Sequence, residues 1–137
     1  MINHYCTQDS SYEGRPYIEI RRNGGPFFTF AGPKQKFQFG RYKALMLLTC
    51  MRQIEEFAWS KGTSPEFHRP IVVSSDQYML RCTCVRYDSF ETSCGFYVRQ
   101  PYLRIESEGT IIGLGVQKAI AILELQSDIE SFVAASS

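Results

Sequence analysis

Side chains that could do covalent or metal chemistry are few and scattered in this 137-residue chain. Cys82, Cys84 and Cys94 lie close together in the sequence, and with His68 they could in principle hold a zinc ion. The Cys-x-Cys spacing is not that of a zinc knuckle or ribbon, however, and buried cysteines are common fillers of protein cores. We therefore expect no metal site.

A nucleophilic site has equally little support. It would need Cys6 or Cys94 beside His4 or His68, and nothing in the sequence pairs these residues. The chain also contains no phosphate-binding loop, no Gly-x-Gly-x-x-Gly and no hydrolase triad signature. We expect a protein without catalysis, cofactor or small-molecule substrate.

Aromatic and basic residues offer a different chemistry, the non-covalent binding of unpaired bases and their phosphates. A base stacked on a ring contributes about 1–3 kcal/mol, and Lys or Arg neutralises phosphate. Period-2 alternation predicts such residues on the outward side of the strands, and only Glu19 and Glu106 oppose their charge. The predicted set is Tyr17, Arg21, Phe27, Lys34, Lys36, Arg81, Tyr87, Tyr97, Arg99, Tyr102 and Arg104.

The elements that must position these side chains follow from hydrophobic periodicity and turn residues. The first half has predicted strands near 2–6 and at 18–22, 27–31 and 34–39, turns at 23–25 and 32–33, and a helix at 40–61. The second half has predicted strands at 71–74, 78–87, 96–99, 102–106 and 110–114, turns at 88–93, near 101 and at 106–109, and a helix at 116–134.

The two halves resemble each other at a fixed offset of 75 residues, without a gap, over about thirty residues. Strand, turn, glycine and helix all match in this one register, which favours duplication over a chance similarity of two amphipathic helices. The identical pairs include Gly40 with Gly115, Ala44 with Ala119, Leu48 with Leu123, Ile54 with Ile129 and Phe57 with Phe132.

The predicted fold class is therefore α+β, with two tandem ββββα repeats that form two antiparallel sheets and two helices. Residues 1–62 would be the first repeat, 63–70 a linker and 71–137 the second repeat, together one compact domain. Because helices cover one side of each sheet, alternating apolar residues such as Ile18, Leu80 and Leu103 should face inward.

Composition is that of a folded globule, with 44% hydrophobic and 14% aromatic residues. The net charge of +1 hides an asymmetry. Residues 1–75 contain ten Lys and Arg against six Asp and Glu, and residues 76–137 contain five against eight. Five scattered cysteines, no signal-like apolar run and no stretch long enough for a membrane span predict a cytoplasmic protein, in the host cytoplasm if viral.

The repeat endings, FGRYKALMLLTCMRQIEEF and LGVQKAIAILELQSDIESFV, resemble the single-stranded-DNA-binding superfamily of the plant Whirly proteins, Pur-alpha and positive cofactor four. The resemblance covers most of the chain as architecture, but its shared motif is short and hydrophobic. It implies a Whirly-like fold, sequence-tolerant binding of single strands on the sheets, and frequent homo-oligomers. The lysine-glycine-lysine strand motif of Whirly proteins is missing, so no binding residue is transferred from that family.

Alternation and resemblance together predict a single-stranded nucleic-acid-binding protein with weak sequence preference, acting in replication, recombination or transcription. DNA is the expected partner, with RNA as an open alternative. A second interpretation is a protein-interaction or self-assembly module that uses the aromatic sheet face. A third is that the tyrosines and arginines are ordinary residues of solvated strands.

Overall fold

The structure is a computed structural model, and it is α+β with antiparallel sheets and helices, as the sequence predicts. Contacts divide the chain into two units, one of residues 1–48 with 121–137 and one of residues 49–120. The residues described are 4–22, 37–74, 79–85, 90–92, 95–97 and 101–136, with the backbone alone for 68, 83–85, 90–92 and 95–97.

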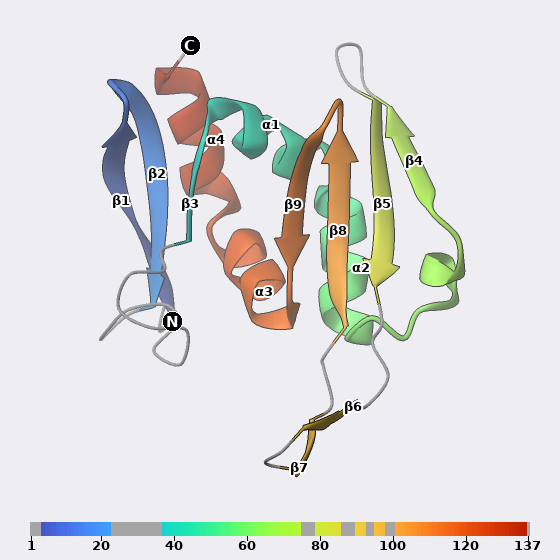
Figure 1. Cartoon of the computed structure of the whole chain (residues 1–137). Helices are drawn as coiled ribbons and strands as arrows, with labels where there is room; N and C mark the ends of the chain where they lie inside the picture. The colour runs from blue at the N-terminus through green and yellow to red at the C-terminus, as the bar shows by residue number, and fades with distance from the viewer. Residues whose placement is uncertain are drawn as a thin grey trace. The chain divides into compact units, whose positions relative to one another are not determined.

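The first unit contains a three-stranded antiparallel sheet in the order β1-β2-β3 (Figure 1). Its strands are β1 (Tyr5–Tyr12), β2 (Arg15–Arg22) and β3 (Phe37–Gly40). Glu13 and Gly14 connect β1 to β2 with φ values of 51° and 77°. A two-residue turn with two positive φ angles matches the twist of a hairpin, and glycine adopts it without steric cost.

The inner face of this sheet is apolar along β2 and β3. Ile18 and Ile20 alternate on β2, Phe37 and Phe39 alternate on β3, and all four side chains are buried, as predicted. The helices α1 (Arg41–Thr49) and α4 (Gln126–Ala135) belong to the same unit and bury further apolar side chains, among them Leu47 and Ile129. Period-2 alternation therefore identifies the core side of this sheet correctly.

The second unit contains a four-stranded antiparallel sheet in the order β4-β5-β8-β9. The inward alternation predicted for its central strands is confirmed, since Leu80, Cys82, Leu103 and Ile105 are fully buried. The helix α2 lies on this inner side and buries Phe57 among other apolar residues (Figure 1). The elements are α2 (Met51–Ser60), β4 (Ile71–Ser74), β5 (Met79–Val85), β8 (Tyr102–Ser107) and β9 (Thr110–Leu114).

Three shorter elements complete the second unit. The 3-10 helix η1 (Pro65–His68) places Phe67 edge-on against Phe57, with ring centroids 6.1 Å apart. The strands β6 (Phe90–Thr92) and β7 (Gly95–Tyr97) pair as an antiparallel ribbon. The predicted turn at 88–93 is therefore wrong at residues 90–92.

Each predicted helix is broken near its middle, which the sequence does not predict. The first helix divides into α1 and α2 at Cys50, and the second into α3 (Val116–Glu124) and α4 at Leu125. Cys50 has φ −103° and ψ 19°, and Leu125 has φ −103° and ψ 18°, where a helix needs ψ near −42°. The bounds of α3 and α4 equal those of α1 and α2 shifted by 75, the offset of the sequence match.

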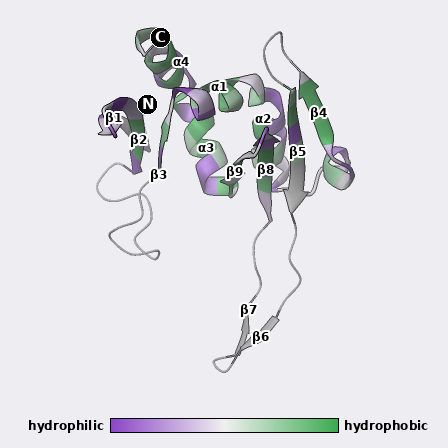
Figure 2. Ribbon diagram, turned by 45° about the horizontal axis from the view of Figure 1, so that its top comes forward, coloured by the Kyte–Doolittle hydropathy of each residue, from purple (hydrophilic) through white to green (hydrophobic). Residues whose placement is uncertain are grey.

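The first strand differs most from its prediction. A short strand was expected near residues 2–6, whereas β1 runs from Tyr5 to Tyr12. Its sequence, YCTQDSSY, has no apolar alternation, and Figure 2 colours it as hydrophilic, whereas β4 is coloured as hydrophobic. The predicted strand at 27–31 and the turns at 23–25 and 32–33 lie outside the described residues.

Candidate nucleic-acid interface

The predicted binding residues fall on two sheets. Tyr17 and Arg21 lie on the outer face of the three-stranded sheet, and Arg81, Tyr102 and Arg104 lie on the outer face of the four-stranded sheet. Only the backbone of Tyr97 is described, as part of β7. The predicted site residues that lie outside the described part of the chain are Phe27, Lys34, Lys36, Tyr87 and Arg99.

Cross-strand pairing arranges the outer face of the three-stranded sheet in rows. We call it the tyrosine face. Tyr12 pairs with Arg15 and Cys6 with Arg21, Ser10 pairs with Tyr17, which pairs in turn with Gly40, and Gln8 pairs with Glu19, which pairs in turn with Gln38. Directly paired residues share one face of a sheet. One end of this face is therefore aromatic and basic, the row of Gln8, Glu19 and Gln38 follows, and Arg21 is a second cation at the other end.

Two rings meet at the aromatic end of the tyrosine face. The centroids of Tyr12 and Tyr17 are 5.7 Å apart, with an angle of 43° between the ring planes. Tyr12 is 54% exposed, and Tyr17 is half-buried. Tyr12 was not among the predicted site residues, because the polar residues before it show no apolar alternation and no strand was predicted there. The Glu13–Gly14 turn signal was the one clue in the sequence.

The cation of Arg21 on this face is partly neutralised. Its Nε donates to Oε1 of Glu19 at 3.1 Å, and its Nη2 donates to Oε2 at 3.4 Å. Glu19 was expected to face outward into solvent, but it is only 6% exposed. The two-pronged contact fixes the plane of the guanidinium, and the Arg21 side chain as a whole is still 45% exposed. Arg21 is therefore a positioned cation with a reduced net charge.

The outer face of the four-stranded sheet has a different character, and we call it the aliphatic face. Tyr102 and Arg104 are half-buried there, and Nε of Arg104 lies 3.0 Å from Oε1 of Glu106. The N–H group does not point at that oxygen, so the contact is an ion pair without a hydrogen bond. Of the three predicted residues on this face, Arg81 is the exposed cation.

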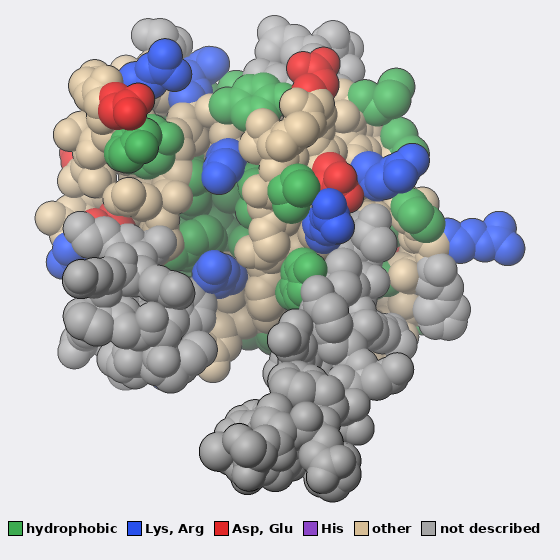
Figure 3. Space-filling model, in the orientation of Figure 1, with side chains coloured by type: hydrophobic (Ala, Val, Ile, Leu, Met, Phe, Trp, Pro, Cys, Tyr) green, Lys and Arg blue, Asp and Glu red, His purple; other side chains and the backbone are tan. Residues whose placement is uncertain are grey.

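Three large aliphatic side chains on the same face are exposed to solvent. Val72 is 60% exposed, Met79 is 71% exposed and Ile111 is 48% exposed. Figure 3 shows apolar side chains among acidic and basic ones over these strands. None of the three was among the predicted site residues, although alternation with the buried Leu80 and Ile112 places Met79 and Ile111 outward.

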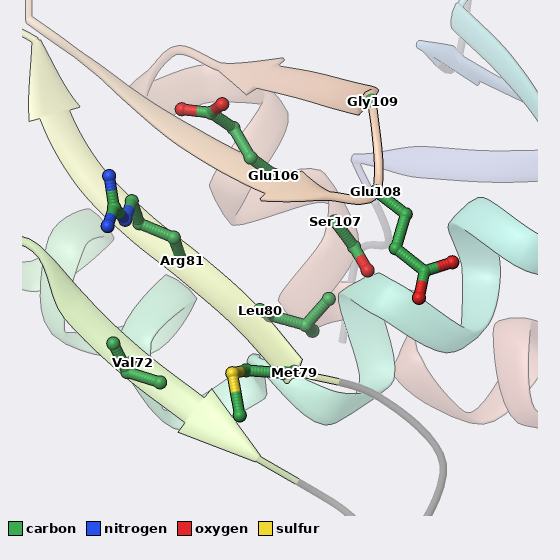
Figure 4. A pocket seen from close by; sticks show the side chains of 8 residues that line it. All are labelled: Val72, Met79, Leu80, Arg81, Glu106, Ser107, Glu108 and Gly109. Atoms are coloured by element: carbon green, nitrogen blue, oxygen red, sulfur yellow. The ribbon is translucent and has the colours of Figure 1, made fainter.

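A shallow hollow of about 270 Å³ opens at one end of the aliphatic face. Figure 4 shows Val72, Met79 and Arg81 on one side of it and Glu106 and Glu108 on the other. The register of β5 with β8 begins at Arg81 and Glu106, so the hollow lies where this ladder ends. The described residues of its lining are aliphatic, charged or small, and none of them is aromatic.

Cys82, one of the cysteines considered and rejected as zinc ligands, has another partner. Cys82 and Cys50 are both fully buried, and their sulfur atoms share a hydrogen bond at 3.5 Å. This hydrogen bond and burial raise the pKa of Cys50 above its ordinary value. Among the side chains that the structure describes, no three Cys, His, Asp or Glu residues gather as a group able to hold a metal ion.

Within the described residues, no helix is long and apolar enough to cross a membrane. No protein-family model matches this chain, and no curated protein matches it either.

Proposed function

We propose that this chain is a non-catalytic protein that binds single-stranded nucleic acid, DNA in preference to RNA, on its tyrosine face. The observation that carries the proposal is the contact between Tyr12 and Tyr17 on a face that also holds Arg15 and Arg21. Rings offer stacking surfaces for successive bases, and nearby guanidinium groups bind the phosphates between them.

The proposed binding is weak, because the charges on this face are few. Two stacked bases contribute about 1–3 kcal/mol each, or about 2–6 kcal/mol together, and the upper end of this range corresponds to a dissociation constant on the order of 10–100 µM at low salt. Each phosphate contact to a single strand gives a slope of about −0.7 in log K against log salt. Two contacts give at most about −1.4, and less where Glu19 already neutralises Arg21.

A titration of fluorescein-labelled oligo-dT, followed by anisotropy at about 20 mM and about 200 mM salt, tests the proposal. We expect Tyr17→Ala and Tyr12→Ala each to weaken binding about fivefold or more, and Arg15→Ala to flatten the salt slope. Trp59→Ala is the matched control, because this ring is 80% exposed and belongs to α2 of the second unit, not to the three-stranded sheet. Undetectable binding at low salt, or equal losses with Trp59→Ala, would refute the assignment.

The aliphatic face favours a second candidate function, a protein-interaction module. Exposed Val72, Met79 and Ile111 suit contact with another apolar surface better than contact with bases, which stack on aromatic rings. The sequence analysis placed such an interface on the tyrosines instead. The described residues support a division in which the tyrosine face binds nucleic acid and the aliphatic face binds protein.

A further inference from the structure

One row of side chains crosses the aliphatic face from edge to edge. Val72 on β4 pairs with Arg81 on β5, Arg81 pairs with Glu106 on β8, and Glu106 pairs with Ile111 on β9. The row therefore reads apolar, positive, negative, apolar across the four strands. Because directly paired residues share a face, all four side chains project from the same side of the sheet.

This row is complementary to itself. Two copies can pack face to face around a two-fold axis that runs parallel to the strands. Each strand of one copy then lies over the strand at the reversed position in the order of the other, so that β4 lies over β9 and β5 over β8. Arg81 then meets Glu106 of the second copy, and Val72 meets Ile111, on both sides of the axis. A two-fold axis across the strands would instead place Arg81 on Arg81, at a cost of like-charge repulsion. The charges thus select one of the two arrangements.

The neighbouring row tolerates the same axis. Arg104 on β8 would lie over the register position of Thr83 on β5, which is uncharged, so no second cation opposes it. The ion pair between Arg104 and Glu106 leaves the Glu106 side chain 35% exposed and able to accept a further contact. Packed sheets lie about 10 Å apart, a distance that these long side chains span.

We propose that the aliphatic face is the interface of a symmetric homodimer, with the row Val72–Arg81–Glu106–Ile111 at its centre. Four strands about 4.8 Å apart and about 20 Å long give roughly 400 Å² per copy, half of the roughly 800 Å² per partner of a standard interface. The dimer is therefore weak and in rapid exchange. The proposal does not depend on nucleic-acid binding at the tyrosine face.

Sedimentation velocity from about 10 µM to about 1 mM tests this proposal, since an interface of this size forms in that range. We expect wild type to shift from monomer to dimer, and Arg81→Glu and Glu106→Arg each to weaken the dimer by about tenfold or more. Arg69→Glu and Glu55→Arg make the same charge changes at exposed positions outside the row, and both should dimerise as wild type does.

An equimolar mixture of the two single variants gives the decisive result. In a mixed dimer, position 81 of each copy meets an opposite charge at position 106 of the other, so the mixture should dimerise although neither variant does alone. Loss of stability within one chain cannot produce this recovery. If Glu106→Arg does not fold, Ile111→Asp replaces it as a variant that abolishes the dimer.

Two results would overturn the proposal. One is a wild type that stays monomeric up to about 1 mM, the range expected for this area. The other is a mixture that stays monomeric while circular dichroism shows both variants folded. A third measurement applies if wild type stays monomeric. If Arg81→Glu then lowers oligo-dT affinity more than Arg69→Glu does, the aliphatic face binds nucleic acid instead of a second copy. The oligonucleotide titration with Tyr12→Ala reads the tyrosine face separately, so either proposal can fail without the other.

Discussion

The ring of Tyr17 lies against Gly40, its cross-strand partner on β3. A β-carbon at Gly40 would come within 2.9 Å of Cε1 of that ring, closer than such atoms approach in proteins. The absence of a side chain at position 40 therefore leaves room for the Tyr17 ring in its contact with Tyr12. The stacking surface of the tyrosine face depends on this glycine.

We predict that Gly40→Ala displaces the Tyr17 ring. Overpacking of this kind costs about 1–3 kcal/mol in a core, and we expect about 1 kcal/mol at this half-buried position. Urea unfolding measures the stability loss, and oligo-dT anisotropy should show weaker binding by the same variant. The outcome that contradicts the prediction is unchanged affinity with a ring that nuclear magnetic resonance shows in its original place.

Gly113→Ala is the matched control for this prediction. Gly113 lies beside Tyr102 on the other sheet, but a β-carbon there would be 3.6 Å from the ring, an ordinary contact distance. Alanine in a strand is favoured over glycine by roughly 0.5–1 kcal/mol, so the control should be neutral or slightly stabilising. Equal destabilisation by both substitutions would mean that ring contact does not explain the Gly40 effect.

The core of this fold could be predicted from the sequence because a strand with one buried face alternates apolar and polar residues. Leu80 and Cys82, or Leu103 and Ile105, alternate with polar residues, and the structure buries them. No such period exists in β1, whose residues are held by pairing with β2 and not by burial. The helix breaks at Cys50 and Leu125 have no local signal either, since neither residue is glycine or proline.

The candidate site was less predictable than the core. Alternation gives the side of a sheet on which a residue lies, but not its neighbours. It placed Glu19 outward correctly in register, yet the bidentate contact with Arg21 and the surrounding side chains bury it. It also said nothing about the row that joins Val72 to Ile111, because pairing between strands distant in sequence decides such a row.

We predict that the tyrosine pair is energetically coupled. Aromatic pairs at this separation contribute about 0.5–1.5 kcal/mol beyond their buried area. Urea unfolding of Tyr12→Ala, Tyr17→Ala and the double variant should therefore give a coupling free energy in that range. Tyr17→Ala combined with Trp59→Ala is the control, and its effects should add, since the two residues belong to different units. Additive effects for the tyrosine pair would contradict the contact.

The turn between β8 and β9 allows a test of backbone strain alone. Gly109 has φ 87°, and nothing lies within 4 Å of a β-carbon placed there. Gly109→Ala should therefore cost about 1–2 kcal/mol through the left-handed backbone and not through a clash. Thermal unfolding measures the change. Gly115→Ala should be neutral, because Gly115 has the same open surroundings without a positive φ. A lowered midpoint for both variants would contradict this explanation.

The last prediction concerns the buried thiols of Cys50 and Cys82. Their hydrogen bond and burial raise the pKa of Cys50 far above its ordinary value of 9.0. Above about pH 9 the unfolded chain loses this proton and the folded chain keeps it. The folded state then binds more protons than the unfolded state, so stability falls as pH rises, by about 1.4 kcal/mol per pH unit for one proton.

Guanidinium unfolding of wild type and of the double variant Cys50→Ala, Cys82→Ala, in reductant at pH 7 to 10.5, measures this effect. Wild type should be the more stable at pH 7, because the double variant leaves a cavity. The difference should shrink above about pH 9, since the double variant has no thiols here to titrate. Other groups titrate in both proteins and cancel. A difference that stays constant through pH 10.5 would show that Cys50 does not hold its proton in the folded core, and the contact between the two sulfur atoms would lose its support.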